Sequence, residues 1–143
     1  MLVRARRLLP ALWAGVLICI AAIAAPSAFA ALPSAEAGQV VSRIFLREAW
    51  LSLAAALPLL WLERRHGPPG HVNTALLWAT VVCTLLGYFA VRALLPAARV
   101  GQVSFSFGQL HLISTVFYGL KTLLVLVLAW RVAGTELSRP PSS

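Results

Sequence analysis

Four apolar runs, separated by short polar segments, dominate the pattern along the chain. They cover about residues 8–29, 44–62, 74–95 and 107–130. A run of roughly 20 apolar residues is long enough to cross the hydrocarbon core of a bilayer as an α-helix. The intervening segments are rich in Gly, Pro, Ser and charged residues, as turns are. The pattern therefore predicts an all-α membrane protein, a four-transmembrane-helix bundle that forms a single domain over residues 1–132.

The first apolar run has two interpretations. A basic start, the breaker Pro26 and the small residues of 28–31 resemble a signal peptide that is cleaved between Ala30 and Ala31. However, the uninterrupted apolar stretch of residues 8–25 has 18 residues, whereas the apolar region of a signal peptide has about 7 to 15. Three more apolar runs follow it, so we expect an uncleaved first membrane helix.

The distribution of basic residues predicts the orientation in the membrane. Four spans place both termini on one side of the bilayer, and cytoplasmic segments carry the excess of Lys and Arg. With the termini in the cytoplasm, seven arginines fall on the inner side and four on the outer side, which are Arg43, Arg47, Arg92 and Arg99. We therefore expect both termini to be cytoplasmic, with residues 133–143 forming a flexible polar tail.

Composition supports the membrane assignment and excludes other classes. Of the 143 residues, 60% are hydrophobic and only 11% are charged, whereas a soluble domain has about 25% charged residues. The net charge of +8 comes from basic groups that flank apolar runs, and no nucleic-acid-binding motif is present. Cys19 and Cys83 lie singly within apolar runs, which is typical of buried free thiols.

Polar residues inside the spans are the candidates for a ligand site, because charges there are costly and often functional. His111, Ser114, Tyr118 and Lys121 follow the spacing i, i+3, i+7 and i+10 and share one helix face. These four could line a polar pocket, or they could only form hydrogen bonds between helices.

Two further candidates for the pocket lie in the second and third spans. Glu48 is expected to pair with one of the basic residues Arg43, Arg47, Arg92 and His111. In the expected orientation Glu48, Tyr88, Arg92 and His111 all fall in the outer part of the membrane, where they could form one pocket; an interfacial belt of anchoring side chains would give a similar pattern.

Several chemistries are not supported by the sequence. His111 and His71 belong to opposite ends of their spans and cannot share one haem within a monomer. There is no Cys/His set with zinc spacing, no phosphate loop and no nucleophile elbow. We therefore expect no enzymatic activity, no metal and no cofactor.

Short motifs along the chain resemble those of the domain-of-unknown-function family 4149, the bacterial relatives of transmembrane protein 205. The matching positions are Trp13, Gly15, Pro26 and Phe29 in the first helix, Ala37, Gly38 and Phe45 before the second apolar run, and Phe107, His111 and Ser114 in the last helix. The resemblance extends over roughly residues 8–131. It implies that the first helix belongs to the mature domain, and it implies no particular activity.

Three functions remain open at this point. The first is a non-enzymatic protein of the bacterial cytoplasmic (inner) membrane that binds or moves a small hydrophobic or cationic solute. The second is an accessory metal, haem or redox membrane protein that uses His111, and the third is a structural membrane partner without a ligand. The expected surroundings are the lipid bilayer and a second copy in a homo-oligomer, with no nucleic acid.

Overall fold

The computed structural model describes residues 2–66, 71–100 and 104–134, and all regular structure in these ranges is helical. Four continuous helical stretches are long and apolar enough to cross a membrane: Arg6–Ala31, Ser34–Arg65, Val72–Ala98 and Gly108–Gly134. The four-span prediction is confirmed. The first three observed stretches extend beyond their predicted apolar runs at both ends, and the fourth extends beyond its run at the C-terminal end only. The predicted tail falls almost wholly outside the described residues.

The first span consists of three segments in one continuous helical path: α1 (Leu2–Cys19), the π-helical turn η1 (Ile20–Ala24) and α2 (Ala25–Ala31). Pro26 lies in the first turn of α2. Its ring removes a backbone donor and needs room in the preceding turn, and the wider π turn lies directly before it. Leu32 is extended and ends the span, so the chain reverses into the next helix within two residues.

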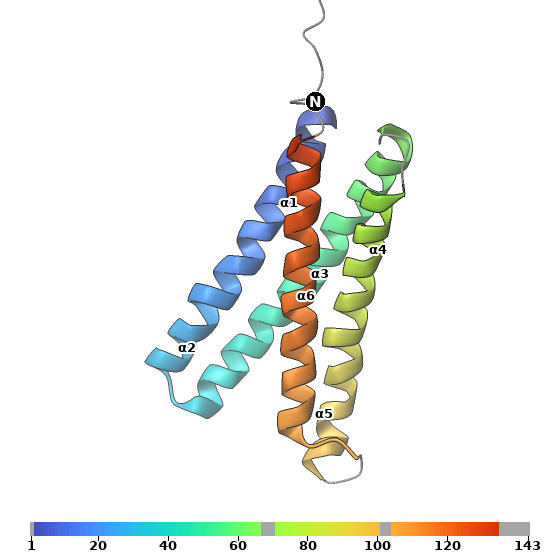
Figure 1. Ribbon diagram of the computed structural model, residues 1–143. Helices are drawn as coiled ribbons and strands as arrows, with labels where there is room; N and C mark the ends of the chain where they lie inside the picture. The colour runs from blue at the N-terminus through green and yellow to red at the C-terminus, as the bar shows by residue number, and fades with distance from the viewer. Residues whose placement is uncertain (1, 67–70, 101–103, 135–143) are drawn as a thin grey trace, which may run out of the picture.

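The second span is the single long helix α3 (Ser34–His66). Its 33 residues correspond to roughly 50 Å at 1.5 Å per residue, which exceeds the hydrocarbon thickness of about 30 Å. In Figure 1, α3 runs obliquely behind the other helices. Such a helix can fit a bilayer by tilting and by projecting its polar ends.

The third and fourth spans form a second helical hairpin. The third consists of α4 (Val72–Thr84), a second π-helical turn η2 (Leu85–Ala90) and α5 (Val91–Arg99), and the fourth is α6 (Phe107–Gly134). We refer to α1, η1, α2 and α3 as the N-terminal hairpin, and to α4, η2, α5 and α6 as the C-terminal hairpin.

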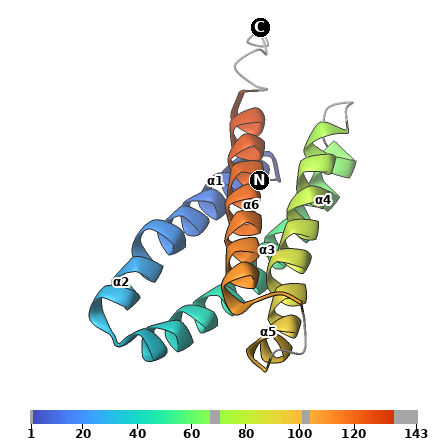
Figure 2. The same cartoon turned by 60° about the horizontal axis from the view of Figure 1, so that its bottom comes forward.

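The two hairpins meet at one end of the bundle, where the chain begins and where α6 ends (Figures 1 and 2). We call this the closed end. There α6 packs against α1 and α4, and α3 packs against α4. The apolar core at this end draws on all four spans and consists of Trp13, Ala14, Leu17, Ala56, Leu59, Leu60, Leu77, Val125, Leu128 and Val132. The positions of Trp13 and Leu17 make the first helix part of this core.

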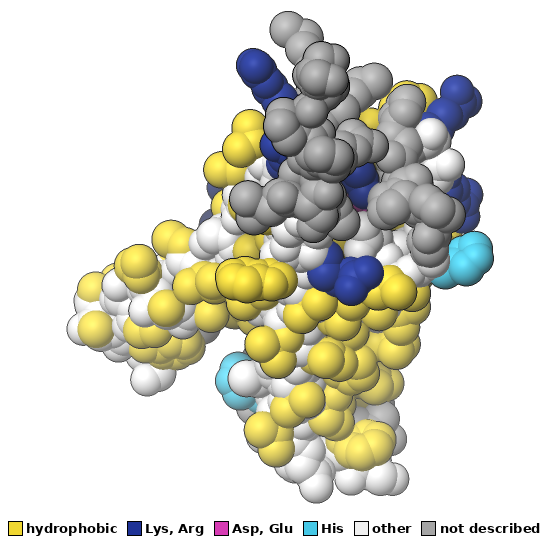
Figure 3. Space-filling view, turned by 45° about the horizontal axis from the view of Figure 1, so that its top comes forward, with side chains coloured by type: hydrophobic (Ala, Val, Ile, Leu, Met, Phe, Trp, Pro, Cys, Tyr) yellow, Lys and Arg dark blue, Asp and Glu magenta, His cyan; other side chains and the backbone are white. Residues whose placement is uncertain are grey.

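At the opposite end the hairpins diverge (Figures 1 and 2). This open end contains the turn between α2 and α3 and the ends of α5 and α6 that face each other. No residue of η1 or α2 is buried. In the space-filling view the two hairpins form separate lobes with a hollow between them, and Lys and Arg side chains gather near the closed end (Figure 3).

Large apolar side chains cover the outside of the bundle. Exposed examples are Leu57, Trp61, Leu123 and Trp130, the last with 84% of its surface exposed. A soluble protein rarely presents such continuous apolar surface. The exposed apolar residues therefore mark the surface that faces lipid.

Candidate functional site

A buried ion pair joins the two hairpins in the middle of the bundle. Nζ of Lys121 on α6 lies 2.8 Å from each carboxylate oxygen of Glu48 on α3. Only 3% of Lys121 and 4% of Glu48 is exposed. The expectation that Glu48 pairs with Arg43, Arg47, Arg92 or His111 is wrong: Glu48 points into the bundle, whereas those four side chains are exposed.

The first helix is tied to this ion pair through two hydrogen bonds. The indole Nε1–H of Trp13 donates to Oγ of Ser52 at 3.0 Å, and the Ser52 hydroxyl donates to Oε1 of Glu48. Trp13 and Ser52 are almost fully buried. Glu48 thus receives hydrogen bonds from Lys121 and Ser52, which together offset the cost of placing a carboxylate in an apolar interior.

Tyr118 lies beside the ion pair on α6. The Nζ of Lys121 is 4.8 Å from the centre of the Tyr118 ring, which adds a cation–π contact. The Tyr118 hydroxyl donates to the backbone oxygen of Leu17 at 2.9 Å. The Phe45 ring packs edge-on against the Tyr118 ring, with their centres 5.0 Å apart. Tyr118 therefore connects α6 to both helices of the N-terminal hairpin.

These deep polar groups are fully used within the protein. Within the part of the chain that the structure describes, every buried side-chain nitrogen or oxygen has a hydrogen-bond partner. Hydrogen bonds between helices hold such groups in a membrane interior, where an unpaired polar atom is costly. The arrangement around Glu48 and Lys121 thus joins α1, α3 and α6, and each of its buried polar atoms has a partner within the protein.

Ser114 bonds the two halves of the C-terminal hairpin at a point of close approach. Its hydroxyl donates to the backbone oxygen of Gly87 in η2 at 2.7 Å. A Cβ on Gly87 would overlap the Cβ of Phe117 and would lie 3.1 Å from its Cγ. Glycine is therefore needed at position 87, because only a residue without a side chain lets η2 lie against α6.

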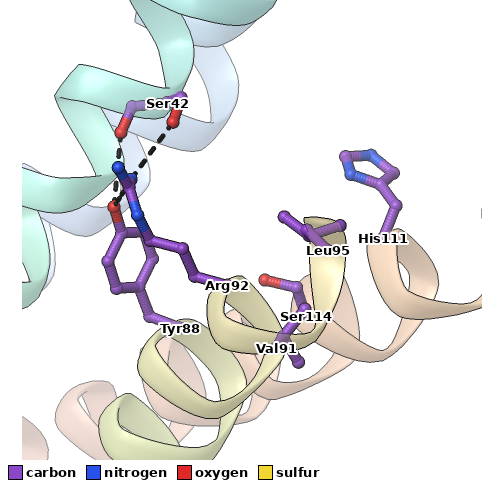
Figure 4. Close-up of a pocket in the computed structure, with 7 residues that line it drawn as sticks. All are labelled: Ser42, Tyr88, Val91, Arg92, Leu95, His111 and Ser114. Carbon is purple, nitrogen blue, oxygen red and sulfur yellow. Dashed lines mark hydrogen bonds between the residues drawn. The ribbon is translucent and has the colours of Figure 1, made fainter. Parts of the chain in front are cut away.

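A pocket with both apolar and polar lining residues lies at the open end, between the two hairpins (Figure 4). Its cavity volume is about 100 Å³. One wall comes from α3 and the others from η2, α5 and α6. The lining residues are Ser42, Tyr88, Val91, Arg92, Leu95, His111 and Ser114.

Arg92 is held at one wall of this pocket by neutral partners. Its Nη1 donates to the Tyr88 hydroxyl at 2.6 Å and to Oγ of Ser42 at 3.4 Å. The guanidinium carbon lies 5.7 Å from the centre of the Tyr88 ring. The Tyr88 hydroxyl in turn donates to the backbone oxygen of Ser42, at 3.5 Å. These contacts orient Arg92 but leave its charge without compensation.

The pocket has an excess of positive charge and donor capacity. The sequence contains only four acidic residues. Glu48 and Glu63 form salt bridges with Lys121 and Arg6, and within the described ranges Arg92 takes part in no salt bridge. The His111 ring is exposed and makes no hydrogen bond to another described residue. An anionic group would be the complementary ligand.

The predicted polar face of the last helix thus divides into two parts. His111 and Ser114 line the pocket, while Tyr118 and Lys121 lie deeper and bond to the N-terminal hairpin. Tyr88, Arg92 and His111 meet in one pocket, as the sequence suggested. The inclusion of Glu48 in that pocket is wrong, because its carboxylate faces Lys121.

A second polar network lies at the closed end, and it was not predicted from the sequence. Arg6 of α1 forms a salt bridge with Glu63 of α3, with a second contact of 3.0 Å. Asn73 of α4 donates to Glu63 at 3.1 Å and accepts from Nε of Arg131 of α6 at 3.1 Å. The network therefore joins all four spans. Its signal in the sequence was Glu63, an acid at the end of an apolar run.

The described residues offer little for a metal centre. Among them, no group of three or more His, Cys, Asp or Glu side chains lies close enough together to hold a metal ion. Cys83 is buried, whereas Cys19 is exposed. Within one copy of the chain, therefore, no described side chains lie close enough to His111 to bind a metal ion together with it.

Comparison with models of known protein families shows which family this chain belongs to. The sequence model of the domain of unknown function DUF4149 matches residues 8–103. This chain belongs to the DUF4149 family. No curated protein and no solved structure gave a significant match.

The matched range, residues 8–103, includes Trp13 of the first helix, Glu48 and Ser52 of α3, and the pocket residues Tyr88 and Arg92. It ends before α6, so the similarity of His111 and Ser114 to family positions stays a prediction. The same applies to Phe107, whose side chain lies outside the described residues.

Several DUF4149 motif positions proposed from the sequence have no direct role at the ion pair or in the pocket. Pro26 and Phe29 are exposed, and an added Cβ on Gly15 or Gly38 would meet nothing within 4 Å. Trp13 does have such a role, since it donates to Ser52 beside the ion pair, and His111 and Ser114 line the pocket. A smaller role falls to Phe45, which packs on Tyr118.

Proposed function

We propose that this DUF4149 protein is a non-enzymatic, multi-pass membrane protein that binds a small solute carrying an anionic group. The pocket formed around Ser42, Arg92 and His111 is the binding site. The observation that carries the proposal is the Arg92 guanidinium, which faces a cavity, is oriented by Tyr88 and Ser42, and has no acidic partner in the described chain.

The character of the pocket changes the expected solute. The sequence pointed to a hydrophobic or cationic molecule, but a cation would be repelled by Arg92. A phosphate or carboxylate would instead receive charge-assisted hydrogen bonds from the guanidinium, with the His111 ring as a further donor. The volume of about 100 Å³ suits a group of this size.

We place the protein in the bacterial cytoplasmic (inner) membrane with both termini in the cytoplasm. The closed end carries the exposed arginines Arg4, Arg7, Arg64, Arg65 and Arg131, which supports a cytoplasmic location for this end. The open end and its pocket then lie in the outer half of the bilayer.

A second candidate is a structural membrane partner without a ligand. The hydrogen bonds around Glu48 and Lys121 support it, because these groups join three helices. The two candidates differ at the open end: a structural protein can use Arg92 as an interfacial anchor, whereas a binding protein also uses the cavity that Arg92 lines.

A phosphate-binding measurement tests the proposal. The protein is placed in nanodiscs of uncharged lipid, and its thermal unfolding is followed with increasing inorganic phosphate. A ligand that binds only the folded state raises the free energy of unfolding by about 2.7 kcal/mol when its free concentration is 100 times its Kd. We expect phosphate to raise the unfolding temperature of the wild type and of Arg47→Gln, but not of Arg92→Gln.

Arg47→Gln is the matched control, since it removes an exposed arginine of α3 that does not line the pocket. An equal rise of the unfolding temperature in all three proteins would mean that phosphate acts outside the pocket. The absence of a rise in the wild type would favour the structural candidate.

A further inference from the structure

The pocket lies where the two hairpins part, and this position bears on the kind of molecule that reaches it. We infer that the anionic group is the phosphate of a membrane phospholipid, which enters sideways from the bilayer and places an acyl chain between the hairpins. The inference rests on the proposed function and names the class of its ligand.

The floor of the space between the hairpins is closed by polar contacts. Ser42 and Glu48 are six residues apart on α3, which corresponds to roughly 9 Å along the helix axis. Below the pocket, the Glu48–Lys121 pair and the Phe45–Tyr118 contact connect α3 to α6 through their side chains. A molecule in the pocket therefore cannot continue toward the closed end.

The pocket is too small for a whole lipid. A volume of about 100 Å³ holds a phosphate with a few attached atoms, so an acyl chain must leave it. In Figure 4 the polar groups of Tyr88, Arg92 and Ser42 lie together on one side of the pocket, and Leu95 and His111 lie on the other side. Figure 3 shows a hollow between the two lobes, and we infer that the acyl chain leaves the pocket on that side.

The segments that border the open end are apolar and uncovered. Ile23 is 61% exposed and Phe29 is 52% exposed, and Val40 at the start of α3 is also exposed. Acyl chains are as apolar as these side chains and can lie against them without cost. This surface would tolerate any chain, so the head group must supply the selectivity.

Charge complementarity selects the phosphate. The exposed basic residues of the open end are Arg43, Arg47 and Arg92, and the described acid there is Glu36. Arginine binds phosphate oxygens through two parallel N–H donors. Arg92 is the one of these three arginines that lines the pocket, and it is therefore the residue on which lipid recognition depends.

The experiment uses photoactivatable lipids. The full-length protein is reconstituted in vesicles of digalactosyldiacylglycerol, an uncharged lipid without phosphate, that contain a small fraction of phosphatidic acid with a diazirine in one acyl chain. A matched probe carries the same chain on a cationic trimethylammonium head group. After irradiation, labelled peptides are mapped by mass spectrometry in the wild type, Arg92→Gln, Arg92→Lys and Arg47→Gln.

We expect the phosphatidic acid probe to label α2, the first turns of α3 and the first turns of α6 more strongly than the cationic probe does. This excess of labelling by the phosphatidic acid probe should be several-fold smaller in Arg92→Gln than in the wild type. It should be intermediate in Arg92→Lys and unchanged in Arg47→Gln. The partial recovery in Arg92→Lys separates loss of charge from loss of folding.

Two results would overturn the inference: equal labelling by both probes, or labelling spread evenly to the region of Trp130. If inorganic phosphate still binds in an Arg92-dependent way, the lipid inference fails and the proposed function stands. If neither probe nor phosphate depends on Arg92, both fail.

Discussion

Glu48 and Lys121 pair across the two hairpins, with the lysine nitrogen 2.8 Å from both carboxylate oxygens and both side chains shielded from the surroundings. A charge in the centre of a membrane helix costs about 2.5–3.5 kcal/mol on insertion scales. The two costs are tolerable here because each charge compensates the other. The pair therefore makes the side-chain connection between α3 and α6 dependent on both residues.

Breaking this pair is expected to destabilise the protein strongly. Glu48→Gln or Lys121→Met alone leaves one buried charge without its partner, which costs about 3–5 kcal/mol. The double variant Glu48→Gln/Lys121→Met removes both charges and should recover most of the loss. Reversible unfolding in mixed micelles, analysed as a double-mutant cycle, measures the coupling. Single variants as stable as the wild type would show that the pair contributes nothing to stability.

Trp13 is expected to stabilise the bundle through both its size and its donor. Trp13→Phe keeps most of the buried ring but loses the hydrogen bond to Ser52, at a cost of about 1 kcal/mol. Trp13→Ala also leaves a cavity and should cost about 3–5 kcal/mol. The same unfolding assay checks both values. As a control, Trp130→Phe changes an 84% exposed ring and should have little effect.

Gly87→Ala is expected to separate η2 from α6. The new methyl group would overlap Phe117, and overpacking of this kind costs about 1–3 kcal/mol. Gly119→Ala is the matched control on α6, because an added Cβ there would meet nothing within 4 Å. Thermal unfolding should show a loss for the first variant and none for the second. Similar values for both would mean that η2 and α6 do not meet closely at position 87.

The orientation can be tested by cysteine accessibility. In a background with Cys19→Ser and Cys83→Ser, Ser34→Cys reports on the open end and His71→Cys on the closed end; both positions are exposed. A membrane-impermeant maleimide added to intact cells should label the first variant only. Labelling of the second without permeabilisation would reverse the proposed orientation.

Much of the fold could be predicted because membrane spans leave a strong pattern. Runs of apolar residues set the number and approximate limits of the helices. The Ser34 start of α3 lies ten residues before the predicted run, since its first turns carry Glu36, Gln39 and Arg43. The π turns η1 and η2 have no comparable signal, although Pro26 lies just beyond the first and Gly87 within the second.

The candidate site was harder to predict, because periodicity shows which residues share a face but not which faces meet. The tilt and rotation of α3 decide that Glu48 reaches Lys121 and that Ser42 reaches Arg92. One signal was available: Glu48 and Lys121 are an acid and a base within different apolar runs, and the cost of leaving either unpaired favours their contact.

The length of α3 has a consequence for the bilayer around the protein. A helix of roughly 50 Å adapts to a thinner membrane by leaning further, and α3 forms one side of the space between the hairpins. Because the Glu48–Lys121 contact fixes its middle, any change of tilt moves its outer end toward or away from α6. Hydrophobic mismatch with the host membrane is thereby transmitted to the width of the opening.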